Sequence, residues 1–140
     1  MAIHLQLGDA VAMLWWEPYT GPEPTPVPSE TMWRAEYFDN QNLFGTPVRV
    51  RNESAIDHDW RDKAPEFGVP NDHFSVRWTA TKLFDTGTYL FKTYTDDGVR
   101  LWFDGQLIID QWKDQHATLY QQSVGVSAGL HSLQMEYYDN

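Results

Sequence analysis

The sequence predicts an all-β domain, an antiparallel β-sandwich or barrel with few or no helices. Three observations support this fold class. Aromatic residues make up 15% of the 140 residues, and flat rings pack well on pleated sheets. Short apolar runs alternate with turns rich in Gly, Asp and Asn, as expected for successive strands. No long run combines helical periodicity with capping residues.

The predicted strands follow one another from residue 33 onward. We expect them at residues 33–38, 74–80, 88–95, 99–103, 106–109, 119–126 and 131–138. Asp104-Gly105 lies between two of these strands and predicts a two-residue hairpin. Ser127-Ala128-Gly129 predicts a second hairpin, and residues 52–73 predict a long ordered loop or a broken strand.

The N-terminal part of the chain divides into two segments before the main domain, residues 31–140. Prolines recur at every second position from Pro22 to Pro28, so residues 18–30 are expected to form an extended, semi-rigid linker. Residues 1–17 are largely apolar and too short to fold alone, so we expect them to pack on a folded partner.

Composition excludes several classes of function. The net charge of −10 disfavours binding to nucleic acid, which needs clustered Lys and Arg, and binding to anionic lipid. The chain has no cysteine, so disulfides and thiolate catalysis are absent. No apolar run approaches the ~20 residues of a membrane-spanning helix, so no membrane insertion is expected. The charge suits a cation or a neutral ligand such as a glycan.

Five sequence blocks in fixed order resemble the protective-antigen β-barrel domain family: WRAEYFDNQNLFG, DHDW, PNDHFSVRWTA, GTYLFKTYTDDGVRLWFDGQLIIDQW and VSAGLHSLQMEYYDN. The resemblance runs from Trp33 to Asn140. It implies a barrel of two antiparallel sheets with a jelly-roll-like topology. It also implies an exported protein, at the cell surface or extracellular, because the family occurs in bacterial glycosidases, adhesins, toxins and yeast flocculin-type lectins.

The adjacent carboxylates of Asp96 and Asp97 are the candidate metal ligands. In the lectin members of the family, two consecutive aspartates joined by a cis peptide hold calcium, and the ion binds sugar hydroxyls. Calcium takes six to eight oxygen ligands, so Asn40, Asp110 and Asp139 are possible further contributors. The alternative is a surface turn in which Gly98 supplies a positive φ.

A sugar also stacks on aromatic rings, and Trp112, which follows Asp110 in a polar segment, is the candidate platform. Asp110 and Trp112 are therefore the expected carbohydrate-binding residues, although a place for Trp112 in the core is about as well supported. Arg77 and Arg100 fall within strands and are expected to pair with carboxylates on the sheet surface.

Three functions compete. The leading interpretation is a calcium-dependent carbohydrate-binding module of a larger exported protein, with a glycan or polysaccharide as partner. The alternative is a non-binding spacer of a repetitive cell-surface protein. A glycoside hydrolase with two carboxylates is the weakest interpretation, because the acids lie in turns and short hairpins imply no deep cleft. We therefore expect no enzymatic activity.

The two ends of the chain suggest a displaced strand. Family domains continue past a segment like EYYDN into one more strand, and residues 8–17 resemble that strand. Residues 1–17 are thus interpreted as the tail of a preceding repeat. We expect this strand to fill the position beside residues 131–138, either in its own chain or by strand exchange with a neighbouring copy.

Overall fold

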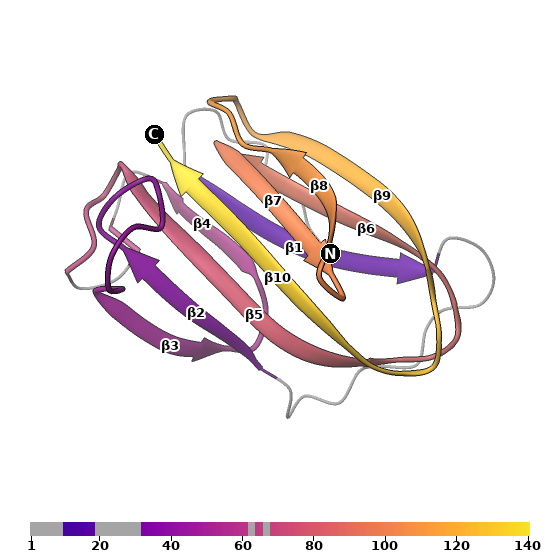
Figure 1. Cartoon of the computed structure of the whole chain (residues 1–140). Helices are drawn as coiled ribbons and strands as arrows, with labels where there is room; N and C mark the ends of the chain where they lie inside the picture. Colours follow the sequence, from indigo (N-terminus) through magenta and orange to yellow (C-terminus); the bar gives the residue numbers. More distant parts are fainter. Residues whose placement is uncertain (1–9, 19–31, 62–63, 66–67) are drawn as a thin grey trace.

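The computed structural model describes residues 10–18, 32–61, 64–65 and 68–140. These residues form two antiparallel sheets that pack face to face, and no helix occurs among them. Figure 1 shows the six-stranded sheet in front and the four-stranded sheet behind it. This arrangement confirms the predicted all-β sandwich. Within the same residues, no helix is both long and apolar enough to cross a membrane.

The six-stranded sheet has the order β3-β2-β5-β10-β7-β8. Its strands, in chain order, are β2 (Trp33–Phe38), β3 (Arg49–Glu53), β5 (Phe74–Phe84), β7 (Gly98–Phe103), β8 (Gln106–Gln111) and β10 (Gly129–Asp139). The four-stranded sheet has the order β4-β1-β6-β9. Its strands are β1 (Ala10–Pro18), β4 (Asp57–Arg61), β6 (Gly87–Asp96) and β9 (Thr118–Val126).

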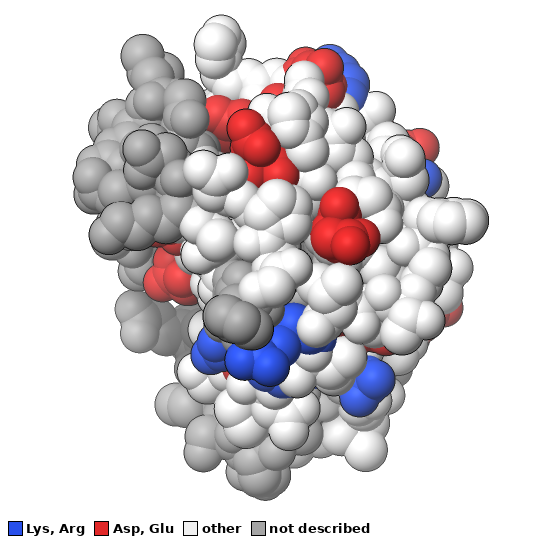
Figure 2. Space-filling view, turned by 90° about the vertical axis from the view of Figure 1, so that its left-hand side faces the viewer, with Lys and Arg blue, Asp and Glu red and all other residues white. Residues whose placement is uncertain are grey.

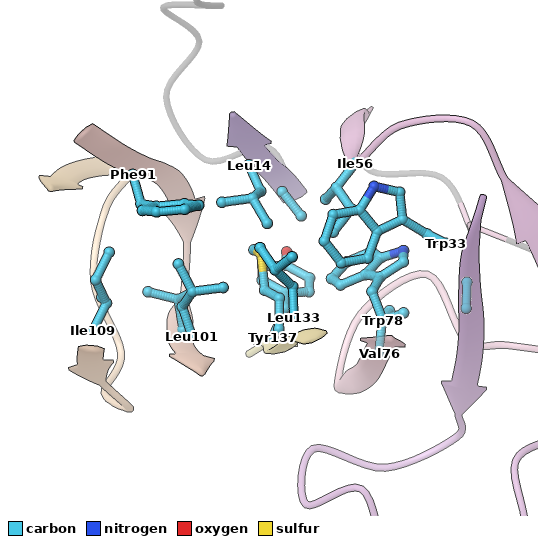
Figure 3. Packing of buried hydrophobic residues seen from close by; sticks show 14 of the residues in the cluster. Leu14, Trp33, Ile56, Val76, Trp78, Phe91, Leu101, Ile109, Leu133 and Tyr137 are labelled. Atoms are coloured by element: carbon cyan, nitrogen blue, oxygen red, sulfur yellow. The ribbon is translucent and has the colours of Figure 1, made fainter. Parts of the chain in front are cut away.

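The core lies between the two sheets and is rich in aromatic rings. Successive side chains of a strand point to opposite faces, so alternate residues of β5 such as Val76 and Trp78 turn inward and are fully buried. Figure 3 shows them meeting side chains from β1 and from the segment that follows β3. Burial of this apolar surface is the main stabilising contribution to the fold.

The hairpin predicted at Asp104-Gly105 is confirmed. Phe103 of β7 is the register partner of Gln106 of β8, which leaves a two-residue loop. Both loop residues have positive φ, 49° at Asp104 and 78° at Gly105, as a hairpin turn of this length requires.

The second predicted hairpin is wrong. β9 pairs with β6 in the four-stranded sheet, whereas β10 pairs with β5 and β7 in the six-stranded sheet. Ser127-Ala128-Gly129 therefore carries the chain from one sheet to the other. Turn residues indicate a reversal of the chain, but they do not distinguish a reversal within one sheet from a crossing between two.

The region expected to be a loop or a broken strand contains strands at its start. β3 ends at Glu53, and β4 covers residues 57–61. Both are edge strands, and β3 exposes four of its five residues. Edge strands tolerate charged side chains, so the apolar alternation that marks a half-buried strand is missing from their sequences.

The N-terminal strand forms, but not at the expected position. β1 pairs with β4 and β6 in the four-stranded sheet, while both neighbours of β10 come from the main domain. The strand fills a position within its own chain, in the sheet opposite to β10. Its origin as the tail of a preceding repeat stays a prediction, and residues 19–30 of the expected linker lie outside the described residues.

Candidate functional site

Three aspartates meet at one end of the sandwich, where the chain crosses between the sheets. Asp96 ends β6, Asp97 forms the crossing, and Asp139 ends β10. All three are about 8% exposed. One carboxylate oxygen of each lies within 4.8 Å of the others, and the peptide bond between Asp96 and Asp97 is cis. The structure thus brings the two predicted ligands together with Asp139, one of the three possible contributors.

Backbone groups fix the side chain of Asp97. Its Oδ1 accepts a hydrogen bond from the backbone N–H of Gln115 at 3.0 Å, and its Oδ2 accepts one from the backbone N–H of Asn140 at 2.7 Å. The carbonyl oxygen of Asp97 accepts further hydrogen bonds from the Gln115 amide at 2.8 Å and the Thr95 hydroxyl at 3.0 Å. The carboxylate is therefore held in one orientation by neutral donors.

Two tyrosines of β10 contact the segment that crosses between the sheets, residues 96–98. The Tyr137 hydroxyl donates a hydrogen bond to the carbonyl oxygen of Asp96 at 2.6 Å, and burial raises the pKa of this tyrosine, so it stays protonated. The Tyr138 ring lies against Gly98, where a Cβ atom would be 2.2 Å from the ring. Gly98 is thus required for close approach. It does not adopt a positive φ, so the surface-turn alternative is wrong in this respect.

The surroundings of Asp139 raise the proton affinity of its carboxyl group. Burial raises the pKa of the Asp139 carboxyl to about 7, and the negative charges of Asp97 and Asp96 act in the same direction. Like charges at this separation disfavour simultaneous ionisation. A bound cation would relieve this repulsion, because it favours the ionised form of each group.

The carboxylates open into a shallow cavity of about 470 Å³. Its lining consists of Asp96, Asp97, Asp114, Gln115, His116, Asp139 and Asn140. Asp114 is fixed there by hydrogen bonds from the Tyr138 hydroxyl at 2.7 Å and the Asn140 amide at 2.9 Å. The cavity therefore offers side-chain oxygen atoms beyond those of the three central aspartates.

The structure does not bring every predicted site residue into this cavity. Asp110 is exposed on β8 opposite Arg100. Trp112 packs against Tyr138, with 4.8 Å between ring centroids, and the Arg100 guanidinium lies 3.9 Å from its ring centroid. The side-chain oxygen of Asn40 instead accepts hydrogen bonds from the backbone N–H groups of residues 42 and 44, within its own loop. None of these three residues lines the cavity, and Trp112 is linked to it through Tyr138, which donates a hydrogen bond to Asp114.

Four lining residues were not among the predicted site residues: Asp114, Gln115, His116 and Asn140. The run of polar residues after Trp112 was the available signal, since it places several oxygen-bearing side chains in one connection between strands. The side of the molecule on which β10 ends is shown in Figure 2. Several separate patches of acidic side chains lie in its upper half, and a group of Lys and Arg lies below them.

Comparison with known proteins now adds to this geometry. The family model of the PA14 domain matches residues 29–140. The chain belongs to the PA14 domain family. This match confirms the resemblance to protective-antigen-type domains, and a PA14 domain by itself is not catalytic, so the chain is not an enzyme.

The PA14 domain described here has regulatory relatives. Over 109 residues it is 42% identical to the anti-sigma-I factor RsgI3 of Acetivibrio thermocellus, covering 76% of this chain and 17% of that protein. A solved anti-sigma factor domain-containing protein superposes with a TM-score of 0.73 at 41% identity, over 79% of this chain and 39% of that one. The chain thus spans well under half of either relative.

A glycosidase shares the fold alone. The β-glucosidase from Kluyveromyces marxianus superposes with a TM-score of 0.57 at 15% identity, over 75% of this chain and 14% of the enzyme. At this identity the likeness concerns architecture only.

Proposed function

We propose that this PA14 domain is a calcium-dependent carbohydrate-binding module of a larger exported protein. The observation that carries the proposal is the convergence of the Asp96, Asp97 and Asp139 carboxylates in one cavity, with oxygen atoms within 4.8 Å of one another. Hard oxygen ligands with several negative charges are the donor set that calcium prefers.

The donor set fits calcium in charge and in number. Three carboxylates supply the anionic ligands, and Asp114 and Asn140 line the same cavity. Calcium takes six to eight oxygen ligands, so ligand positions beyond those of the protein are open to water or to two neighbouring hydroxyls of a sugar. Asp96, Asp97 and Asp139 hold the ion, and the shape of the 114–116 segment selects the sugar.

The relatives suggest what binding is for. Two of them carry the name of an anti-sigma factor, a regulator of transcription. A carbohydrate-binding domain in such a protein would serve as its sensor, so that sugar at the domain changes the regulatory part elsewhere in the chain. We propose this sensing role, and an extracellular position of the domain, for the protein that contains it. The parts played by Asp110 and Trp112 in sugar contact stay predictions.

Calorimetric titration with calcium tests the metal site. Asp96→Asn and Asp97→Asn should each weaken calcium binding at least a hundredfold, because each variant loses an anionic ligand. Asp85→Asn, an exposed aspartate at the opposite end of β6, is the matched control and should bind as the wild type does. Unchanged affinity in both site variants would contradict the proposal.

A glycan array run with calcium and again with chelator tests the sugar. Binding to at least one glycan that is lost on chelation, and lost in Asp97→Asn, is the expected result. Calcium should also raise the thermal midpoint, since a ligand of the native state at 100 times its Kd adds about 2.7 kcal/mol of stability. Stabilisation by calcium with no glycan binding would favour the spacer instead.

A further inference from the structure

The outer face of the six-stranded sheet is turned toward the viewer in Figure 1. The strand register places two different groups of side chains on this face. The first row crosses five strands as neighbours in register and alternates in charge: Asp110, Arg100, Glu136, Arg77 and Glu36. The Arg77 Nε atom lies 3.0 Å from Glu136, and the Arg100 guanidinium lies 3.4 Å from the same carboxylate. Both arginines of this row are paired with carboxylates, as predicted.

A second group of side chains lies beside the first row, displaced from it by two to four residues along β5, β7 and β10, and three of its members are short: Thr79, Thr81 and Ser132. Thr79 and Thr81 of β5 stand beside Ser132 and Gln134 of β10, and Trp102 of β7 is the register partner of Gln134. Because small side chains lie between larger neighbours, the face is hollowed there into a cavity of about 540 Å³, which all five residues line. This volume is typical of small-molecule binding sites.

The hollow retains unused hydrogen-bonding groups. The hydroxyls of Thr79, Thr81 and Ser132 make no hydrogen bond to another described residue. Gln134 donates to Glu136 at 3.3 Å, which leaves its amide oxygen as an acceptor for a ligand. Hydroxyl and amide groups that both donate and accept suit a ligand that is itself rich in hydroxyls.

The lining contains no charged side chain, and its one aromatic residue is a tryptophan. A neutral lining disfavours phosphate or carboxylate ligands, which need cationic partners. An indole ring provides the apolar surface on which the C–H face of a sugar ring stacks. The chemistry therefore combines one stacking surface with several neutral hydrogen-bonding groups, and this is the complement of a neutral sugar.

We propose that this hollow is a second carbohydrate-binding site, which takes a neutral oligosaccharide and needs no calcium. Trp102 stacks on one sugar ring, and Thr79, Thr81, Ser132 and Gln134 bind its hydroxyls. The site lies on the same strand as Asp139, about 17 Å from it at ~3.3 Å per residue between positions 134 and 139. It is therefore separate from the aspartate cavity and independent of its occupancy.

Binding in the presence of chelator is the test. Wild-type protein in EDTA is titrated with neutral hexasaccharides, namely cellohexaose, xylohexaose, mannohexaose and maltohexaose, by calorimetry and by saturation-transfer NMR. At least one should bind. Trp102→Ala should weaken binding at least about tenfold, as loss of an aromatic anchor does. Phe44→Ala, which removes an aromatic ring 77% exposed and outside the hollow, should not change it.

A second variant keeps the test independent of folding. Thr81 is exposed, so Thr81→Lys fills the hollow with a long side chain without disturbing the core, and it should abolish binding in EDTA. Calcium-dependent binding at the aspartates should survive both variants. The inference is overturned if no hexasaccharide binds in EDTA, or if binding is unaffected by Trp102→Ala and Thr81→Lys. Neither outcome would bear on the calcium site, which Asp97→Asn tests separately.

Discussion

Two groups of buried carboxylates lie in this domain, and they are treated in opposite ways. Glu53 and Glu136 of the six-stranded sheet are surrounded by arginine, histidine, tyrosine and tryptophan donors. Glu53 receives Trp78 Nε1 at 2.9 Å and His58 Nε2 at 2.7 Å, together with the Tyr37 hydroxyl. The aspartates at the end of the sandwich instead surround one another, and Asp97 is held by backbone N–H groups alone.

The pKa values follow this difference. Burial acts to raise the pKa of the Glu53 carboxyl, but the hydrogen bond and charge of His58, with the bonds from Tyr37 and Trp78, outweigh it and leave the pKa lowered. At Asp139 burial and neighbouring charges act together, and the pKa rises to about 7. A carboxylate that the protein neutralises itself is structural, whereas a group of carboxylates left to repel one another is suited to an external cation.

The largest effect is expected from removal of Glu53, a carboxylate of the structural group. Glu53→Ala leaves two buried donors, Tyr37 and Trp78, and the half-buried His58 without their acceptor, and it should lower the free energy of unfolding by about 3–5 kcal/mol. Urea denaturation measures the loss. Glu17→Ala is the control, because its ion pair with Lys92 is half exposed and such pairs contribute about 1 kcal/mol or less. A loss below about 1 kcal/mol in Glu53→Ala would contradict a structural role.

The next effect tests how the aspartate end is built. Gly98→Ala places a Cβ atom 2.2 Å from the Tyr138 ring, so the ring or the strand must shift. Overpacking of this kind costs about 1–3 kcal/mol, and the shift moves Asp97, so calcium affinity should fall with stability. Gly125→Ala on β9, where the added atom meets nothing, is the matched control. Wild-type affinity for calcium in Gly98→Ala would show that the crossing tolerates the shift.

Asp139→Asn should separate stability from binding. Because the folded state raises the pKa of this carboxyl, the calcium-free protein should lose stability as pH rises from about 4 to about 7. The neutral amide removes the repulsion, so the variant should be roughly 1–2 kcal/mol more stable than wild type at neutral pH without calcium. It should also bind calcium at least tenfold more weakly. Thermal melts with chelator and with calcium measure both, and a destabilised variant in chelator would contradict the repulsion.

The smallest effect concerns the ion pair of His131 and Asp104, neither of which lines the cavity of Asp96, Asp97 and Asp139. His131 Nδ1 lies 2.6 Å from Asp104. This hydrogen bond, with the one to the Ser127 carbonyl, raises the pKa of His131. The same contact with His131, with the hydrogen bond from the Ser132 backbone N–H, lowers the pKa of Asp104. The stabilisation is complete below the ordinary His pKa of 6.5 and above the ordinary Asp pKa of 3.8. It disappears as pH rises through the pKa of His131 in the folded protein.

Urea midpoints of wild type and His131→Gln, measured between about pH 5.5 and about pH 8.5, check this window. The difference between the two proteins should shrink as pH rises. A constant difference would mean that His131 acts through its packing on Phe103 and not through its charge.

The sequence predicts the central strands well because their patterns reflect burial. Residues 33–38 and 99–103 largely alternate buried and more exposed side chains, and turn residues follow both. The strand at 49–53 escapes prediction because it is an exposed edge, with Arg49 and Arg51 where apolar residues would mark a strand. The N-terminal strand is recognisable, but its neighbours are not, because pairing depends on which sheet has an open position.

The candidate site is predictable only in its adjacent pair. Asp96 and Asp97 stand together in the sequence, and family resemblance identifies them. Asp139 is one of several possible ligands until the register of β10 beside β7 places it at the same end. Gln115 and Asn140 hold the Asp97 carboxylate through backbone N–H groups, which every residue has, so the polar segment after Trp112 indicates their neighbourhood but not these two contacts.

The position of β1 has a mechanical consequence. The chain enters the sandwich in β1 and leaves it in β10, in opposite sheets but at the same end, since Val11 is the register partner of Asp96 and Tyr137 contacts the Asp96 carbonyl. Tension along the chain would therefore pull the two layers apart at that end. Separation from one end breaks the side-chain packing between the layers step by step, because every strand pairing among the described residues lies within one sheet. An ion bound by both Asp96 of β6 and Asp139 of β10 would connect the two sheets at this end. The force needed to separate the sheets would therefore depend on whether the ion is bound.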